Sequence, residues 1–397
     1  MWLFLVVLTL PHTNPPYLNR FPVCEMLLNA WRLSSFLVVA IWVFLIKKKI
    51  SLVSVLISIW EAFLLITTII HQGDVYKTAA TAFSVLSIVL LYDAAHDRGL
   101  PFLSSQLFCF EIIIYVNLIT EMLFPNGLYS ERIYFITQYK NWFLGYYNNH
   151  TKYFIPAIMF ALLYTKKRKS YLRIIPLIFA IFLSSLLCWS GGVILSLFIM
   201  FIVYIFFNTF TQIFNYFTYW LMHILFFFVV YILRLQHLFR WLIDNILGKW
   251  RSLEIRITFW ERTIKLISKS PVWGHGVQNQ LIRITELHLN DGVHAHNMLL
   301  EILYQGGMIG LGLWIAIVIT AGIGLYQYRN SEKSKIIATA FLGWCVATLV
   351  EPFTTCFLMG MFVIAYYGNC DSRRHGSCLK KRNRKKLRFT RAKISKR

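Results

Sequence analysis

The sequence predicts an all-α polytopic membrane protein of about 12 transmembrane helices, with a large extracytoplasmic loop that carries short helices. Of the 397 residues, 57% are hydrophobic and only 14% are charged, and the mean hydropathy is +0.58. A soluble domain of this length could not bury so much apolar surface. The apolar stretches have the length of helices and lack the regular alternation of barrel strands, so helices are the expected way to satisfy the backbone in lipid.

The expected spans follow one another along the chain. Their centres lie near residues 8, 38, 60, 84, 112, 160, 180, 200, 226, 310, 342 and 362. The first and the last are short, so about 10 or 11 crossings also fit the pattern. The opening segment MWLFLVVLTL has neither a basic start nor a small-residue cleavage site. We therefore expect a retained first span rather than a cleaved signal peptide.

Clusters of Lys and Arg orient these spans. They are found at Lys47 to Lys49, Lys166 to Lys169, Arg329 to Lys335 and in the tail after Gly368. With both termini in the cytoplasm, all four clusters fall on the cytoplasmic side, as the positive-inside rule requires. This orientation places two long polar loops outside, residues 125–152 and 233–295.

The domain prediction follows from this topology: one membrane domain, residues 1–367, and a basic cytoplasmic tail, residues 368–397. The tail holds thirteen Lys and Arg and one acid, Asp371. Such a run could bind nucleic acid, but directly after a span it meets the anionic inner leaflet. We expect it to lie on the membrane and to fix the topology, with no nucleic-acid partner.

The large outer loop, residues 233–295, has nine Lys and Arg against five acids, a net charge of +4. Clustered guanidinium groups fit phosphate, so this excess favours an anionic ligand on the outer face. A charged loop that only stays solvated, or touches anionic headgroups, is the alternative.

One segment of this loop has helical periodicity. From Ser252 to Ser270 the apolar residues recur every three to four positions, which predicts a helix with Arg256 and Arg262 near its edges. Pro271 is expected to stop the helix, and Gly274-His275-Gly276 then forms a flexible turn whose N–H groups could approach a ligand. Most turns of this kind are only turns.

The next candidates lie where the loop meets an apolar span. His294, His296 and Asn297 precede the segment MLLEIL, and a histidine at a helix start can act as a base or hold a phosphate. Glu301 lies four residues after Asn297 on the same helical face, and Glu351 stands near another outer helix end. We expect both acids to line an outer pocket. No metal site is predicted, because no carboxylate or cysteine completes the histidine pair at ligand spacing.

Other polar groups give weaker signals. The seven cysteines are scattered and odd in number, so neither a disulfide framework nor a metal site is predicted from them. Glu61, Glu111 and Glu121 lie within or near spans, where a charge is a functional candidate by default. Pairing between helices would explain them equally well.

Four short motifs together resemble a known family. They are Arg256-x3-Trp260, Ser270-Pro271-x2-Gly274-x-Gly276, His296-Asn297 and Gly306-Gly307-x2-Gly310-Leu311. This order is similar to the C-terminal signature of the O-antigen polymerase and ligase superfamily, and the resemblance is specific over roughly residues 250–315. In the first outer loop, Gly145-Tyr146-x-Asn148-Asn149 resembles the family's glycine and asparagine segment. Many members carry an arginine after the serine of the short outer connection, whereas Ser190 is followed here by Gly191 and Gly192.

The resemblance implies an inverting glycosyl transfer without metal or other cofactor. The donor would be an oligosaccharide on undecaprenyl pyrophosphate, and the acceptor a sugar hydroxyl. The site would face the outside of the bacterial cytoplasmic membrane. Its partners would be the bilayer, the lipid-linked oligosaccharide, and a flippase and chain-length regulator of the same pathway.

The implied roles fall on the residues found above. Arg256 is expected to clamp the pyrophosphate and His296 to activate or position the acceptor, which Asn297 would orient. Substrate-binding residues would be Arg262, Arg283, His294, His275, Gly274, Gly276, Glu301 and Asn148.

Three functions compete. A repeat-unit polymerase, of the kind that builds capsular or exopolysaccharide or O-antigen, is favoured from overall resemblance. A ligase that moves finished polymer to lipid A core shares the signature. A flippase of lipid-linked sugars is the third, but such transporters usually show internal repeats and broken helices in both halves, and this sequence shows no two-fold pattern. Flipping by proteoliposomes without bond formation would favour this third function.

Overall fold

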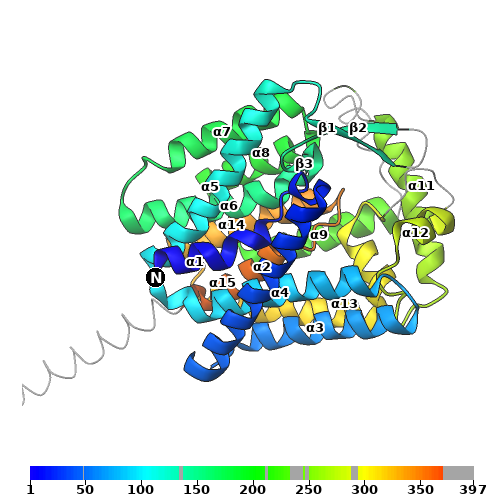
Figure 1. Ribbon diagram of the computed structural model, residues 1–397, viewed down its shortest axis with the longest axis horizontal. Helices are drawn as coiled ribbons and strands as arrows, with labels where there is room; N and C mark the ends of the chain where they lie inside the picture. The colour runs from blue at the N-terminus through cyan, green and yellow to red at the C-terminus, as the bar shows by residue number, and fades with distance from the viewer. Residues whose placement is uncertain are drawn as a thin grey trace, which may run out of the picture.

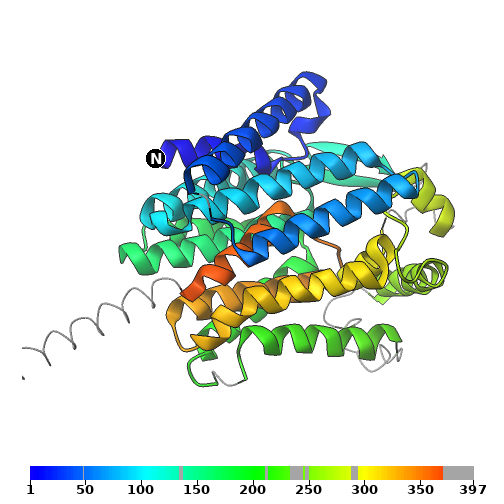
Figure 2. The same ribbon diagram turned by 90° about the horizontal axis from the view of Figure 1, so that it is seen from below.

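The computed structural model describes residues 1–47, 49–133, 137–210, 213–232, 245, 250–287 and 294–369. In this part of the chain, long helices run side by side in a bundle, and short helices cover one end of it (Figures 1 and 2). The predicted all-helical membrane class is confirmed.

The helices have the following bounds. Before the large loop come α1 (Trp2–Thr9), α2 (Pro22–Ile41), α3 (Leu52–Ile70), α4 (Val75–Ala95), α5 (Leu100–Leu123), α6 (Thr151–Arg168), α7 (Ile174–Cys188), α8 (Gly191–Phe206) and α9 (Tyr216–Phe227). Within and after it come α11 (Trp250–Ile267), α12 (Gln280–Leu287), α13 (Met298–Gln327), α14 (Glu332–Thr348) and α15 (Cys356–Tyr366).

Five helical segments are long and apolar enough to cross a membrane. They are Pro22–Lys47, Leu52–Ile70, Val75–Arg98, Leu100–Leu123 and Met298–Gln327. Shorter apolar helices accompany them, including α7, α8, α9 and α15. Large apolar side chains such as Leu172, Phe201 and Ile70 are 83%, 64% and 64% exposed, as expected for a surface that lipid covers. The count of about 12 crossings stays a prediction.

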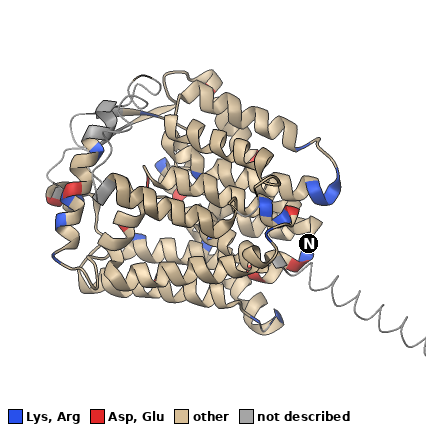
Figure 3. Cartoon of the chain, turned by 180° about the vertical axis from the view of Figure 1, so that it is seen from behind, with Lys and Arg blue, Asp and Glu red and all other residues tan. Residues whose placement is uncertain are grey.

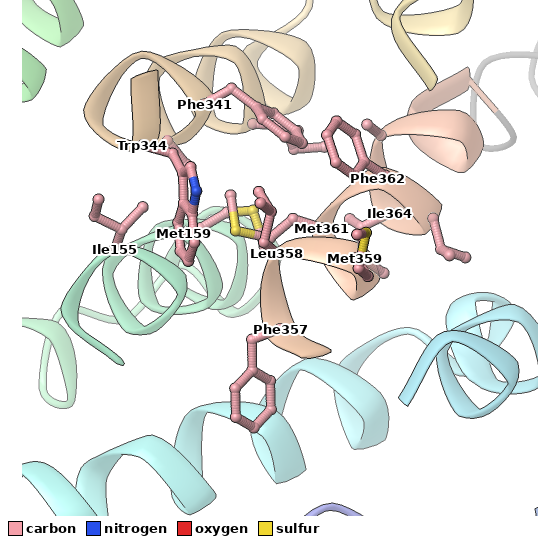
Figure 4. Close-up of a cluster of buried hydrophobic side chains, with 14 of the residues drawn as sticks. Ile155, Met159, Phe341, Trp344, Phe357, Leu358, Met359, Met361, Phe362 and Ile364 are labelled. Carbon is pink, nitrogen blue, oxygen red and sulfur yellow. The ribbon is translucent and has the colours of Figure 1, made fainter. Parts of the chain in front are cut away.

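The core joins the C-terminal helices to α6. Figure 4 shows Phe341 and Trp344 from α14 packed with Phe362 from α15 and Met159 from α6. All four side chains are buried. Because α14 and α15 are fixed in this cluster, the short segment between them, residues 349–355, is held at one end of the bundle.

The segment predicted as the first outer loop contains a feature that the sequence did not predict. Its residues form a three-stranded antiparallel sheet of β1 (Tyr129–Ile133), β2 (Thr137–Trp142) and β3 (Gly145–Tyr146). Tyr129 pairs with Asn141, and Trp142 pairs with Gly145. The indole N–H of Trp142 donates to the Phe124 carbonyl at 2.9 Å. The sheet is thereby tied to the end of α5, and it fixes the turn that follows, residues 147–150.

The predicted amphipathic helix of the large loop is confirmed as α11. Its apolar stripe includes Ile257, Trp260 and Ile264, which pack with Ala295 and Leu300 from the start of α13. The helix therefore lies across the end of the bundle (Figure 1), and Lys and Arg are visible on it (Figure 3). The helix begins two residues before the predicted start. It ends three residues before the predicted end, because a turn begins before Pro271.

Two of the acids in predicted spans are paired. The Arg173 guanidinium donates to Glu111 at 3.0 Å, and Glu121 accepts hydrogen bonds from several neighbours that are described below. The predicted tail lies outside the described residues except for Gly368 and Asn369, and so do residues 233–244, 246–249 and 288–293 of the large loop.

Candidate active site

Glu351 is the centre of a polar cluster at the end of the bundle that α11 covers. Its carboxylate accepts a hydrogen bond from Asn148 Nδ2 at 3.0 Å and from Arg256 Nη2 at 3.1 Å. His296 Nδ1 lies 3.3 Å from the same carboxylate, and His294 Nε2 lies 3.8 Å away. Three separate chain segments thus meet at the acid that a fourth segment carries. We call these five residues the Glu351 cluster.

Arg256 reaches Glu351 because α11 is anchored one turn further along. Trp260, four residues later, is only 3% exposed and packs with Ala295 and Leu300. The Arg256 side chain is 20% exposed, so a ligand from solvent can reach it.

Asn148 reaches the cluster from a different part of the chain. It lies in the turn after β3, and its Oδ1 accepts a hydrogen bond from the Ser190 hydroxyl at 3.0 Å. Ser190 precedes α8 and is 1% exposed. The short connection between α7 and α8, in which Gly191 follows Ser190, therefore supports the site through Asn148.

His296 is held by the start of α13. Asn297 caps this helix by accepting from the Leu300 N–H at 3.1 Å. Its Nδ2 donates to the Leu349 carbonyl at 3.2 Å, which joins the start of α13 to the segment that carries Glu351. Asn297 is completely buried. Its position supports His296 and Glu351, while its predicted contact with the acceptor stays a prediction.

The two histidines contact each other. Their ring centroids lie 4.2 Å apart, and the backbone N–H of His296 donates to His294 Nδ1 at 3.3 Å. His296 has a φ of +48°, a conformation that costs free energy in residues other than glycine. The surrounding contacts hold it there, including Phe259, whose ring centroid is 5.2 Å away.

Charge keeps Glu351 ionised. Burial alone would raise the pKa of this carboxyl, but His296, His294 and Arg256 together hold the pKa at about 2. Burial, with help from neighbouring His296, lowers the pKa of His294 from 6.5 to about 4. Near neutral pH the cluster therefore contains one fixed anion, one fixed cation and a neutral His294.

The prediction that no carboxylate completes the histidine pair was wrong, because it considered only spacing along the sequence. In the folded protein Glu351 completes the set. One ligand atom each from His294, His296 and Glu351 lie within 4.8 Å of one another, because the fold brings together residues that are far apart in sequence. The arrangement could hold a metal ion. The Arg256 guanidinium on the same carboxylate opposes a second cation, so the cluster fits an anion or a hydroxyl group better.

Arg283 and Glu301 form a buried pair behind this cluster. Arg283 Nη2 donates to Glu301 at 3.0 Å, and its guanidinium carbon lies 3.6 Å from the Tyr304 ring centroid. Glu301 also accepts from the Ala295 N–H at 2.8 Å. Arg283 is only 2% exposed. This pair holds the chain just before His296, and direct substrate contact by either residue stays a prediction.

The predicted glycine turn packs against α13. The N–H groups of His275 and Gly276 donate to the carbonyls of Tyr304 and Gln305 at 2.7 and 2.9 Å, and His275 Nε2 lies 2.8 Å from the Leu266 carbonyl. The Gly274 N–H donates to the Ser270 carbonyl at 3.0 Å. These N–H groups hold protein partners in this structure, so their binding of substrate stays a prediction. Arg262 lies six residues after Arg256, so the helical repeat places it on another face of α11.

A second buried cluster lies beneath the turn that carries Asn148. Glu121 accepts from Asn117 at 2.6 Å, Ser184 at 2.8 Å and Cys188 at 3.2 Å. His150 Nδ1 lies 3.4 Å from the same oxygen. Glu121, His150 and Cys188 have the spacing of metal ligands. Because three hydrogen bonds already reach this oxygen, we interpret the cluster as a support for the turn.

Comparison with known proteins agrees with the resemblance seen in the sequence. Residues 153–315 match the family model described as O-antigen ligase. A protein named O-antigen ligase from Pseudomonas aeruginosa is 30% identical over 104 residues, and this match spans 25% of this chain and 25% of that protein. No solved structure matches.

The helical membrane fold defines the class, an integral membrane protein. Both matches carry the name O-antigen ligase, in agreement with the resemblance to the O-antigen polymerase and ligase superfamily seen in the sequence. The matched range includes Arg256, His294 and His296 but not Asn148 or Glu351. From the sequence, Glu351 was predicted only as an acid that lines an outer pocket. Its contact with His296 could not be predicted, because the two residues are far apart along the chain.

Proposed function

We propose that this protein is a membrane glycosyltransferase that joins lipid-linked oligosaccharide repeat units. It transfers a glycan from undecaprenyl pyrophosphate to a sugar hydroxyl, with inversion and without a metal, at the outer face of the bacterial cytoplasmic membrane. The observation that carries the proposal is the Glu351 cluster, which places a histidine and a guanidinium beside one ionised carboxylate.

Glu351 would prepare His296 to act as a base. When the carboxylate accepts a hydrogen bond from Nδ1–H, the proton is fixed on that nitrogen and Nε2 keeps its lone pair. Among the described residues none bonds to His296 Nε2, and the side chain is 19% exposed. This nitrogen can therefore accept the proton of an acceptor hydroxyl.

The proposed step balances as a single displacement. The acceptor oxygen forms a bond to the anomeric carbon while the bond from that carbon to the pyrophosphate oxygen breaks. The electron pair leaves with the pyrophosphate, and the hydroxyl proton moves to His296. Arg256 stabilises the charge that grows on the leaving group, which is the largest kind of contribution to many such reactions.

The product chemistry distinguishes two members of this class. A polymerase adds repeat units to a lipid-linked chain, and the resemblance of the whole sequence to repeat-unit polymerases favours it. A ligase is the second candidate, because both matches are named O-antigen ligase. The lipid bilayer and the lipid-linked oligosaccharide would serve either reaction, and a flippase and chain-length regulator would act beside the polymerase.

Deletion of the gene tests the choice. Loss of a polymerase should leave single repeats, or no polymer, on the lipid carrier and the cell surface. Accumulation of full-length polymer on the lipid carrier would instead show a ligase. Unchanged polysaccharide in the deletion strain would contradict both functions.

A further inference from the structure

A cavity of about 530 Å³ is lined in part by residues that closely follow Asn148 and Glu351 along the chain, and the mechanism above does not use it. Residues of the chain between α1 and α2, of α2 and α4, of the start of α6, and of the segment before α15 line it. Two short segments connect it to the site, because Lys152 follows Asn148 by four residues and Thr354 follows Glu351 by three. Its volume is in the range of small-ligand sites.

The lining of this cavity is cationic and hydrogen-bonding. It includes three basic residues, Arg32, Lys77 and Lys152, and one acid, Glu25. Hydroxyl and amide groups make up much of the rest: Thr13, Asn14, Asn19, Asn29, Thr81, Ser84, Thr354 and Thr355. Such groups recognise phosphate and sugar oxygens.

Arg32 is the strongest indication of a ligand. It lies within the candidate span Pro22–Lys47, where an isolated charge is costly and usually faces a functional cavity. Its Nε donates to the Pro11 carbonyl at 3.0 Å. Nη1 donates to Asn29 Oδ1 at 2.8 Å, and Nη2 donates to Asn14 Oδ1. These neutral acceptors fix the guanidinium in one orientation without neutralising its charge.

Lys152 adds a second charge from another helix. Its Nζ lies 5.1 Å from the Tyr153 ring centroid. Within the described part of the chain, no carboxylate lies at ion-pair distance from the side-chain nitrogens of Arg32, Lys77 or Lys152. The cavity lining thus carries three basic residues against one acid, Glu25, an excess of positive charge.

We propose that this cavity binds the phosphorylated headgroup of a second lipid, separate from the donor held at the Glu351 cluster. The ligand chemistry is a phosphate or pyrophosphate ester with hydroxyl groups beside it. The role of this second lipid rests on the proposed function: the lipid carries the acceptor sugar. Its headgroup would then be held beside the segments that lead to Asn148 and Glu351, and the acceptor sugar would extend from there to His296.

Lipid stoichiometry tests this inference. The purified full-length protein in neutral phosphatidylcholine nanodiscs is titrated with undecaprenyl pyrophosphate, and bound lipids are counted by native mass spectrometry. We expect two bound molecules in the wild type and one in R32Q/K152Q, or an affinity at the second site that is weaker by about 10-fold or more. K166Q is the matched control, since Lys166 pairs with exposed Glu332 away from the cavity.

A second titration distinguishes the source of the headgroup. Phosphatidylglycerol that displaces the second undecaprenyl pyrophosphate equally well would identify a site for bulk anionic lipid, and would overturn the acceptor role. One bound molecule in the wild type, or two in R32Q/K152Q, would overturn the site itself. If the double variant unfolds, the single variants R32K and K152R, which keep the charge, must retain two molecules.

Failure of the proposed function gives a different result from failure of this inference. A protein that forms no glycosidic bond could still bind two lipids, and the count would not change. Conversely, an active enzyme with one bound lipid would refute only the second site.

Discussion

At the scale of single residues, Glu351 organises the candidate site. Asn148, Arg256 and His296 all contact its carboxylate, although they come from different parts of the chain. Arg256 helps to keep the carboxylate ionised, and the carboxylate in turn orients the His296 ring. Glu351 therefore acts as a positioning group for both residues.

Replacing Glu351 with Gln tests this positioning role. Gln keeps the size of the side chain but removes the charge that fixes the Nδ1 proton of His296, so we expect kcat to fall by roughly 10²-fold or more. The measurement is turnover of lipid-linked oligosaccharide. E332Q is the control, because Glu332 is 44% exposed and forms an ion pair with Lys166. An E351Q variant with wild-type kcat would refute the arrangement.

The pH dependence of stability tests the burial of His294. Its pKa in the folded protein is about 4, below the ordinary 6.5. Between these values the unfolded chain binds a proton that the folded protein does not, so stability falls as the pH falls from 6.5 towards 4. Glu351, with a pKa of about 2, loses its contribution only below about pH 4.5.

We therefore expect His294→Gln to reduce the drop in Tm between pH 7 and pH 5. His296, Glu351, Glu301 and Arg283 also face His294, so the variant is compared with wild type over the same interval. Exposed His71 provides the control, because His71→Gln should keep the wild-type drop. An identical drop in His294→Gln would show that His294 does not cause it.

At the scale of elements, the glycine motifs join the large loop to α13. Gly307 has a φ of +59° and interrupts the helical geometry of α13. Met308 and Ile309, which follow it, donate their N–H groups to the Pro271 and Val272 carbonyls at 2.8 and 3.2 Å. The interruption thus lets the turn after α11 dock where the helix opens.

Replacing Gly307 with Ala should break this contact. A Cβ there would lie 2.4 Å from the Val272 carbonyl oxygen, in a backbone region that costs roughly 1–3 kcal/mol for other residues. We expect a Tm several degrees lower in detergent. Gly312→Ala on the same helix meets nothing within 4 Å and should be neutral or stabilising by up to about 1 kcal/mol. Equal Tm values for the two variants would contradict this account.

The sequence predicted elements with a strong period and missed those set by distant contacts. The apolar stripe with Trp260 predicted α11 to within a few residues. The sheet around Trp142 was not predicted, because its short strands depend on pairing and on the Phe124 carbonyl. The Gly274 motif was recognised, but its packing against Gly307 needs a contact between segments that no local pattern reveals.

At the scale of the whole molecule, one end of the helix bundle carries the chemistry. The Glu351 cluster lies there, and two short segments, residues 148–152 and 351–354, lead from it to the cavity with Arg32. Composition and helix length were sufficient to predict the class. They could not predict that residues 148, 256, 296 and 351 converge, because that depends on how α14 and α15 pack in the core.

The basic tail belongs to the same scale. We propose that residues 370–397 hold the chain in its orientation and take no part in bond formation. Truncation after Asn369 should lower the yield of inserted protein while turnover per inserted molecule in detergent stays nearly unchanged. A truncated protein that inserts normally yet forms no polymer would contradict this role.

The most direct test of the central claim is a reconstitution of bond formation. Purified protein is given undecaprenyl-pyrophosphate-linked repeat units in the presence of a metal chelator, and both polymer length and released undecaprenyl pyrophosphate are measured. The account predicts a ladder of polymers and one released carrier per bond. R256A and H296A should lose roughly 10²-fold or more of this activity while they remain folded. Wild-type activity in either folded variant would contradict the account.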